Sequence, residues 1–348
     1  MLNGAIIGFG KIAINGHAPA FQDPRIRERL TITAIVDPNP ESWPMAEAVF
    51  PGVTCYPTVD DLLDRQTVDF VDICSPPVFH PEAIRKCSQR GIHLLCEKPL
   101  GTSPQDLVRL TELLGENRNR PFVFMPCHQY RYSPIWKRFK YFIDTAEDDS
   151  RFFLQFNIFR PRADQGYFPG NVNWRTERSI AGGGILADTG VHYLALCLWM
   201  LGGPIHIRAS TLCLNHALPN VEDTAVVFLE CQKGVADIVL TWGADRRANS
   251  ARIVSRTGSL IYDGQSLEHR RCNDNESIPV PDASDKTTYT GMYVSLFDEF
   301  IGRVETKKND SAWVQEALDT ARILFSCYES AQTGQTISTK NTLNKNFK

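Results

Sequence analysis

Short apolar runs alternate with longer segments of helical periodicity through the first third of the chain. The apolar runs predict buried strands, which fall at residues 3–9, 31–37, 70–74, 93–96 and 122–125. Helices are predicted between them, at residues 11–21, 81–90 and 104–117. The last helix opens on Ser103 and Asp106, which have the spacing of a capping box. Alternating strands and helices of this kind indicate a doubly wound α/β domain with a parallel sheet.

After about residue 126 the pattern changes to strands that follow one another without helices. Apolar side chains from Phe152 to Ile158 alternate with the polar Gln155 and Asn157, which predicts a strand with one buried face. Further strands are predicted at residues 205–214, 223–230, 235–242 and 251–255, and helices at residues 185–201, 292–303 and 312–330. Residues 263–290 are polar and rich in turn formers. This order indicates an α+β fold with a large, open, mostly antiparallel sheet.

The change of pattern divides the chain into two domains, residues 1–126 and residues 127–348. A length of 348 residues agrees with two domains. Residues 235–242 carry apolar side chains on both faces of their strand, whereas helices are available to cover only one face. An open apolar face of that size predicts a homodimer or homotetramer formed through the second-domain sheet.

Composition narrows the class of protein. The net charge of -3 lacks the basic excess of a nucleic-acid-binding protein, so we expect no nucleic-acid partner. No apolar run approaches membrane-spanning length, and no leader precedes the first strand, so we expect no membrane association. The ten cysteines are scattered and form no Cys-x-x-Cys pair, which favours free thiols in the cytoplasm. No Cys/His cluster has zinc spacing, and we expect no metal.

A glycine-rich turn links the first strand to the first helix. Its residues are Gly8, Phe9, Gly10, Lys11 and Ile12, followed by an alanine. Glycines at such a turn allow the backbone to approach a pyrophosphate, and the helix amino terminus offers free N–H groups to its charge. The alternative is a turn that only packs the strand on the helix.

Asp37 ends the second strand, 29 positions after Gly8. A carboxylate there accepts hydrogen bonds from an adenosine ribose and repels a 2′-phosphate, so NAD is favoured over NADP. The spacing is longer than usual, and we interpret residues 23–29 as a loop insertion that accounts for it.

Two further segments carry proton-handling side chains. Lys98, in Glu97-Lys98-Pro99, lies just past the fourth predicted strand, at the edge of the sheet where ligands bind. Asp188 and His192 are four residues apart, which on an α-helix places them on the same face. Gly190 between them weakens the helix and suggests that another element packs closely there. The alternatives are a surface turn at Lys98 and an N-cap at Asp188.

Glu-Lys-Pro-Leu at residues 97–100 and Gly-Gly-Gly-x-Leu-x-Asp-x-Gly-x-His at residues 182–192 resemble the signatures of the glucose-fructose oxidoreductase and inositol dehydrogenase family. The resemblance spans both halves of the chain. It implies an NAD-binding Rossmann domain at residues 1–126 and a substrate-binding and oligomerisation domain at residues 127–348. It also implies that Lys98 meets the reacting hydroxyl, that Glu97 faces the nicotinamide ribose, and that the Lys98–Pro99 bond is cis.

The resemblance extends to other segments of the chain. It suggests cofactor contacts for Ser75, Pro76, His80 and Gln129 and substrate contacts for Arg131, Tyr132, Trp174 and Arg175. Pro77 stands where relatives commonly have asparagine, so a rigid strand-to-helix turn is the alternative for residues 75–80. An interdomain ion pair is the alternative for Arg131, and a stacked surface pair is the alternative for Trp174 and Arg175.

These residues together predict a dehydrogenase that moves a hydride between nicotinamide and a carbinol carbon of a sugar, cyclitol or sugar derivative. His192 is the preferred general base, because its ordinary pKa lies nearest neutrality. Asp188 would orient it or bind a neighbouring hydroxyl, and Lys98 would stabilise the developing alkoxide. The roles of Lys98 and His192 are exchangeable at this point. A redox-neutral NAD-dependent glycosidase and a non-catalytic dinucleotide-binding regulator are the alternative functions.

Overall fold

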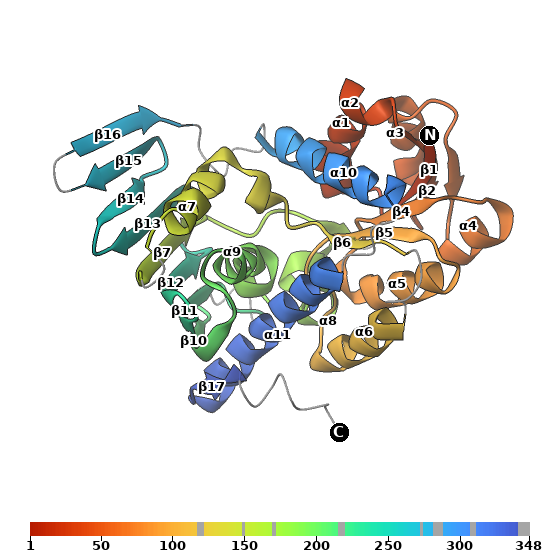
Figure 1. Ribbon diagram of the computed structural model, residues 1–348. Coiled ribbons are helices and arrows are strands. Elements are labelled where there is room, and N and C mark those ends of the chain that lie inside the picture. Colours follow the sequence, from red (N-terminus) through yellow and green to blue (C-terminus); the bar gives the residue numbers. More distant parts are fainter. Residues whose placement is uncertain are drawn as a thin grey trace.

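The computed structural model describes residues 1–116, 122–147, 150–168, 172–214, 220–271, 274–280, 288–306 and 311–339. Its first sheet has six parallel strands in the order β3-β2-β1-β4-β5-β6 (Figure 1). The strands are β1 (Leu2–Ile7), β2 (Leu30–Val36), β3 (Thr54–Tyr56), β4 (Phe70–Ile73), β5 (His93–Cys96) and β6 (Phe124–Pro126). The doubly wound parallel sheet is therefore confirmed, and β3 is the strand that the sequence pattern did not show.

Helices flank the first sheet on both faces. They are the π-helical turn η1 (Ala13–His17), α1 (Ala18–Phe21), α2 (Pro24–Arg27), α3 (Trp43–Val49), α4 (Val59–Arg65), α5 (His80–Gln89) and α6 (Pro104–Glu116). The expected capping box forms at α6, where Ser103 and Asp106 each accept the other's backbone N–H, at 3.1 and 3.2 Å. The interpretation of residues 23–29 as a loop was wrong. Asp23 caps a short helix there, accepting the N–H of Arg25.

The second sheet has nine strands in the order β16-β15-β14-β13-β7-β12-β11-β10-β17. They are β7 (Phe152–Phe159), β10 (Pro204–Leu212), β11 (Thr224–Cys231), β12 (Gly234–Thr241), β13 (Ala248–Ser255), β14 (Gly258–Tyr262), β15 (Ser266–Arg271), β16 (Asp274–Pro279) and β17 (Ile337–Ser338). All neighbouring pairs are antiparallel except β7 and β12. Residues 263–290, which the sequence showed to be polar and rich in turn formers, contain the strands β15 and β16 at one end of the sheet.

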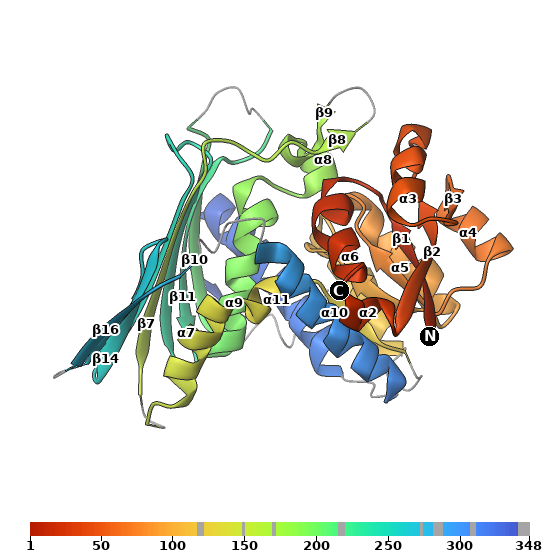
Figure 2. The ribbon, with the colours of Figure 1, turned by 90° about the horizontal axis from the view of Figure 1, so that it is seen from above.

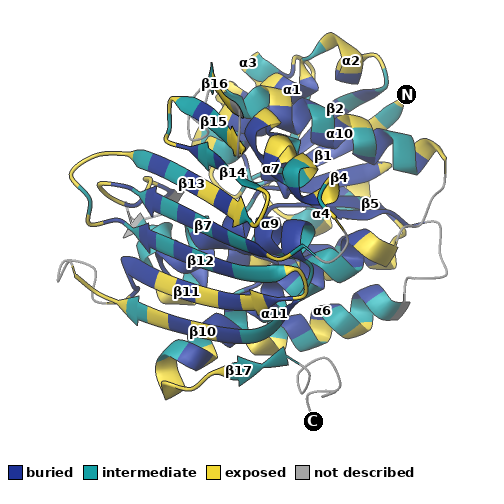
Figure 3. Ribbon diagram, turned by 60° about the vertical axis from the view of Figure 1, so that its left-hand side comes forward, coloured by how far each residue is buried: buried dark blue, intermediate teal, exposed yellow. Residues whose placement is uncertain are grey.

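One face of this sheet is covered and the other is open. Helices α7 (Pro134–Asp144), α9 (Val191–Leu201) and α11 (Ser311–Thr333) lie on the covered face (Figure 2). Side chains of β12 that point toward them are fully buried, whereas Val235 and Val239 on the other face are partly exposed. No helix of the described residues lies over that outer face, which Figure 3 shows from the front.

The last two helices also pack against the first sheet. Phe297 and Phe300 of α10 (Tyr289–Glu305) share a buried cluster with Ile6 and Phe70 of the parallel strands. Leu318 of α11 belongs to the cluster on the opposite face of that sheet. Chain segments from both ends of the sequence therefore build the core of the first half. The boundary at residue 126 stays a prediction.

The structure tests two expectations from composition, the free cysteines and the absence of a membrane-spanning run. The nine cysteines among the described residues are free, and seven of them are buried. One helical stretch, Arg178–Leu201, is long and apolar enough to cross a membrane by length and composition, contrary to the expectation that no run approached that length. Within its most apolar window, 78% of the residues are buried inside the protein, where they form part of the core.

Candidate active site

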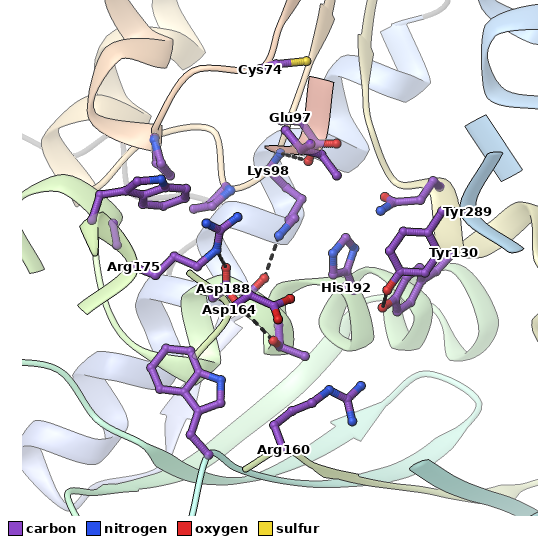
Figure 4. A pocket seen from close by; sticks show the side chains of 18 of the residues that line it. Cys74, Glu97, Lys98, Tyr130, Arg160, Asp164, Arg175, Asp188, His192 and Tyr289 are labelled. Carbon is purple, nitrogen blue, oxygen red and sulfur yellow. Dashed lines mark hydrogen bonds and ion pairs between the residues drawn. The ribbon is translucent and has the colours of Figure 1, made fainter. Parts of the chain in front are cut away.

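A cavity lies where the carboxyl ends of β4 and β5 face the helical segment that begins α9 (Figure 4). Both domains contribute to its walls. Nine of the residues predicted from the sequence line it: Ile12, Ser75, Glu97, Lys98, Gln129, Trp174, Arg175, Asp188 and His192. The other nine lie outside the lining: Gly8, Phe9, Gly10, Lys11, Asp37, Pro76, His80, Arg131 and Tyr132.

Lys98 reaches across the cavity from β5 to the second domain. Its peptide bond to Pro99 is cis, as the resemblance implied. The Nζ atom donates a hydrogen bond to the backbone carbonyl of Asp188 at 2.6 Å. Its partner is thus a neutral carbonyl rather than a carboxylate, which leaves the ammonium charge available to a ligand in the cavity (Figure 4).

The segment Leu186–Gly190 is a π-helical turn rather than the expected α-helix. The wider turn changes the directions of its side chains, so the same-face argument for Asp188 and His192 does not hold there. Arg175 Nε donates to Asp188 Oδ1 at 3.0 Å, and the guanidinium lies 4.1 Å from the Trp174 ring. The carboxylate of Asp188 therefore orients Arg175, and no described hydrogen bond connects it to His192.

His192 is almost fully buried beneath Tyr130. The two rings stack with centroids 4.3 Å apart, inclined by 14°. Burial, and then the positive charge of Lys98, holds the pKa of His192 well below 6.5. The imidazole is therefore neutral at pH 7 and able to accept a proton. Its Nδ1 is buried and has no hydrogen-bond partner among the described residues.

The triple glycine positions this helical segment against a buried glutamate. A Cβ on Gly184 would overlap the carbonyl of Glu222, so only glycine permits that approach. The Glu222 carboxylate accepts the N–H groups of Gly184 and Leu186 at 2.9 and 3.1 Å, and the hydroxyl of Tyr328 at 2.8 Å. Sequence reasoning missed Glu222, which lies far from the motif in the chain. The close packing expected at Gly190 is present, because a Cβ there would lie 3.3 Å from Leu240.

The glycine-rich turn has the geometry of a dinucleotide site. Gly8 has φ +89°, and a Cβ there would lie 2.6 Å from the backbone nitrogen of Ser75. A Cβ at Gly10 would meet open space. Asp37 accepts the N–H of Phe9 at 2.7 Å, which holds its carboxylate beside the turn.

Two buried polar atoms at the cavity also agree with a dinucleotide site. Ser75 Oγ and Gln129 Oε1 are buried without a hydrogen-bond partner among the described residues, and both residues line the cavity. Buried polar groups are rarely left unpaired in folded proteins, so a polar ligand group there is expected. The residues present fit a dinucleotide.

A buried network behind the cavity was not foreseen from the sequence. His17 lies between Asp72 and Glu97, with N···O distances of 2.6 and 3.0 Å, and Tyr293 of α10 donates to Glu97 at 2.7 Å. Burial lowers the pKa of His17, but the two carboxylates outweigh it and raise the pKa to about 9. Burial raises the pKa of Glu97, but the hydrogen bond and charge of His17 lower it to about 2. The histidine is thus charged and holds Glu97 ionised.

The same network contains groups that could ligate a metal. The ligand atoms of His17, Asp72 and Cys74 lie within 4.8 Å of one another, and so do those of His17, Glu97 and Cys127. Burial raises the pKa of both thiols well above 9, so they are protonated. The expectation of no metal stays a prediction.

Three residues expected to contact ligands have protein partners elsewhere. His80 faces the carbonyls of Ser75 and Pro99 at 2.7 and 2.8 Å, and so joins the two cavity loops instead of lining the cavity. Arg131 pairs with Glu316 at 3.0 Å, the ion-pair alternative for this residue. The hydroxyl of Tyr132 donates to Glu299 at 2.6 Å. Glu316 follows Arg131 by 185 residues and Glu299 follows Tyr132 by 167 residues, so no local signal revealed these pairs.

Comparisons with known proteins agree with this geometry. Residues 2–125 match the oxidoreductase family with an NAD-binding Rossmann fold, and residues 152–261 match the GFO/IDH/MocA carboxyl-terminal domain. Inositol 2-dehydrogenase 2 of Saccharopolyspora erythraea is 24% identical, covering 88% of this chain and 86% of its own. The scyllo-inositol 2-dehydrogenase (NADP(+)) IolW of Bacillus subtilis is 22% identical, covering 95% and 94%.

Two solved structures share the fold over nearly the whole chain. An oxidoreductase from Agrobacterium radiobacter in complex with NAD+, L-tartaric acid and magnesium has a TM-score of 0.83 at 19% identity, covering 98% of this chain and 99% of its own. The WlbA dehydrogenase from Bordetella pertussis in complex with NADH and UDP-GlcNAcA has a TM-score of 0.81 at 22% identity, covering 97% of each chain. The two family matches cover both halves of the chain, and the protein therefore belongs to the GFO/IDH/MocA family of NAD(P)-dependent oxidoreductases.

Proposed function

We propose that the protein is an NAD-dependent dehydrogenase that oxidises one CH–OH group of a sugar, cyclitol or sugar derivative. The observation that carries this proposal is the meeting of Lys98 and His192 in one cavity, a cation and a neutral base from different domains. That pair suits removal of a proton from a hydroxyl whose carbon gives up a hydride. The inositol dehydrogenases among the relatives support a polyhydroxylated substrate.

The first domain supplies the cofactor site. The turn from Gly8 to Ile12 would hold the pyrophosphate, and Asp37 beside it would accept the adenosine ribose hydroxyls. Ser75 and Gln129 would pair with the nicotinamide end, where each has a buried polar atom without a partner among the described residues. Bound NAD supplies the hydride acceptor.

The proton is handled by the second domain and Lys98. As the carbinol carbon gives up a hydride, which carries two electrons to NAD, the hydroxyl proton passes to His192, which is neutral and can receive it. The ammonium of Lys98 stabilises the oxygen as negative charge develops on it. Arg175, oriented by Asp188 and packed on Trp174, would bind hydroxyls of the ring.

The proposal is tested with a panel of hexoses, pentoses, inositols and sugar acids in the presence of NAD, with NADH absorbance as the readout. NADH formation on at least one polyhydroxylated compound, lost with Lys98→Met, is the expected result. Release of a leaving group without net NADH would show a glycosidase. Tight NAD binding with no turnover on any compound would show a regulator.

A further inference from the structure

The cavity wall on the side of the nine-stranded sheet is rich in arginine. Arg160, Arg162, Arg175 and Arg247 line it, and Lys98 faces them from the first domain. The carboxylates in the same lining are Glu97, Asp164 and Asp188. Cationic side chains therefore outnumber acidic ones in the cavity, although the whole chain carries a net charge of -3. The positive excess is a local property of this site.

Asp188 and Glu97 have cationic partners within the protein. Asp188 pairs with Arg175 at 3.0 Å, and Glu97 shares the buried His17 with Asp72, at 3.0 and 2.6 Å. Among the described residues, no carboxylate lies within ion-pairing distance of Arg160, Arg162 or Arg247. The unmatched positive charge is thus concentrated on the wall that the second domain contributes.

Arg160 is the most constrained of these arginines. Only 4% of its surface is exposed. Its Nη1 donates to the carbonyl of Phe159 and to Asn249 Oδ1, each at 2.7 Å, and lies 3.3 Å from the carbonyl of Ala248. The Nε and Nη2 groups have no described partner. These neutral acceptors fix the guanidinium without balancing its charge, and a buried charge without a counter-ion is costly.

The unpartnered edge of Arg160 has a definite chemistry. Nε and Nη2 of a guanidinium point two N–H groups in parallel, the arrangement that a carboxylate accepts with both oxygens. Figure 4 shows Arg160 on the sheet side of the cavity and Lys98 on the opposite side, with His192 between those two levels. A ligand that reaches both sides would present a hydroxyl to Lys98 and an anion to Arg160.

We propose that the substrate is a sugar acid, whose carboxylate binds Arg160 and is attracted by Arg162 and Arg247 while its reacting hydroxyl lies at Lys98 and His192. The inference rests on the proposed dehydrogenase function for the position of the hydroxyl. The carboxylate subsite itself rests on the burial and contacts of Arg160, so binding tests it separately from turnover.

The experiment measures binding to the NAD-loaded protein by calorimetry, with matched pairs that differ at one carbon: D-glucose and D-glucuronate, D-galactose and D-galacturonate, D-mannose and D-mannuronate. The 6-phosphates of the same hexoses form a third arm. At least one uronate should bind about tenfold more tightly or better than its matched hexose and hexose phosphate. NADH formation is recorded in parallel.

Variants locate the effect. Arg160→Gln keeps donors for the neutral acceptors and should remove most of the preference for the uronate, with NAD affinity unchanged. Arg247→Gln, at an exposed position with no described structural contact, should reduce the preference severalfold even if Arg160→Gln fails to fold. Arg246→Gln is the matched control, because Arg246 is the exposed neighbour of Arg247 and does not line the cavity.

The outcomes separate the two proposals. If no uronate binds more tightly than its hexose, or if Arg160→Gln and Arg247→Gln weaken both equally, the sugar-acid inference is wrong even when neutral sugars yield NADH. A preference for the hexose phosphates would also overturn it. Uronate binding that depends on these arginines, without NADH formation, would support the subsite and contradict the dehydrogenase.

Discussion

At the scale of single residues, the surroundings of His192 lower the pKa of its imidazole. Burial and the charge of Lys98 both favour the neutral imidazole, and its possible carboxylate partner Asp188 is engaged by Arg175. His192 should thus remain a proton acceptor across the neutral range.

We predict that His192 titrates well below pH 6.5, so that the acid limb of kcat/KM also lies below that pH. NMR titration of the imidazole measures this directly. In Lys98→Met the pKa of His192 should rise, because a nearby positive charge is removed. A His192 pKa near 6.5 in the wild type, unchanged in the variant, would show that neither burial nor Lys98 controls it.

A second prediction concerns Asp37, which we expect to determine the preference for NAD over NADP. Its carboxylate is held at the glycine-rich turn by the Phe9 N–H, where a 2′-phosphate would meet its charge. The wild type should prefer NAD over NADP by at least about tenfold in kcat/KM, which corresponds to ~1.4 kcal/mol. Asp37→Ser with Pro38→Arg should narrow or invert the ratio, whereas Glu41→Ser, at an exposed nearby position, should leave it unchanged. Equal use of both cofactors by the wild type would place Asp37 away from the ribose.

At the scale of secondary-structure elements, the sequence predicted what local patterns encode. Buried strands such as β4 and β5 appear as apolar runs, and the α6 capping box lies within four residues. The strand β3 has only three residues, and β15 and β16 are short polar strands at one end of the sheet, so none of them has the alternating apolar residues that predict a strand. The π-helical turn at Leu186–Gly190 depends on packing against Glu222, and an apolar periodicity does not reveal it.

The residues of the candidate site also fall into two groups, those that short motifs predict and those that only tertiary contacts reveal. Lys98 and His192 were found because short motifs contain them, and both line the cavity. His17 and Arg160 instead contact residues that lie far away in the sequence. His17 lies against Asp72 and Glu97, and Arg160 donates hydrogen bonds to residues 248–249. Their importance comes from tertiary contacts that no spacing along the chain displays.

The His17 network ties the first helix to β4, β5 and α10, and this predicts a pH dependence of stability. The pKa of His17 is about 9 in the folded protein and 6.5 when unfolded, so the folded state binds more protons between these values. The stabilisation is complete below pH 6.5 and is lost as pH rises through about 9, in total on the order of 3 kcal/mol.

Calorimetry at pH 6, 7.5 and 9 measures this effect through the unfolding temperature. The wild type should lose stability with rising pH, and His17→Gln should be less stable at pH 6 with a much flatter dependence. His206→Gln, which alters a partly exposed histidine of β10, serves as the control. Parallel curves for the wild type and His17→Gln would mean that His17 is uncharged in the folded protein.

At the scale of the whole molecule, the outer face of the nine-stranded sheet carries exposed apolar side chains. Val226 and Phe228 of β11 are 40% and 44% exposed there, and Val254 of β13 is 37% exposed. Apolar side chains gathered on an open face favour contact with another surface, and we infer that a second copy covers it.

Light scattering at micromolar concentration should therefore show a homodimer or homotetramer. The double variant Val226→Glu/Phe228→Glu should scatter as a smaller species, because charges on the face would have to be buried on assembly. Tyr141→Glu changes a side chain that is 69% exposed on α7, on the other side of the sheet, and should leave the size unchanged. A wild-type monomer at that concentration would rule out this interface.

The central claim is that the two domains bring Lys98 and His192 together to oxidise a hydroxyl beside NAD. The most direct measurement compares Lys98→Met with the wild type, recording NADH formation on the best compound of the panel and NAD affinity by calorimetry. The account predicts a fall in kcat of at least about a hundredfold, with NAD affinity within a fewfold, because the ammonium acts on the hydroxyl oxygen and not on the pyrophosphate. Near-normal turnover in Lys98→Met would contradict the account.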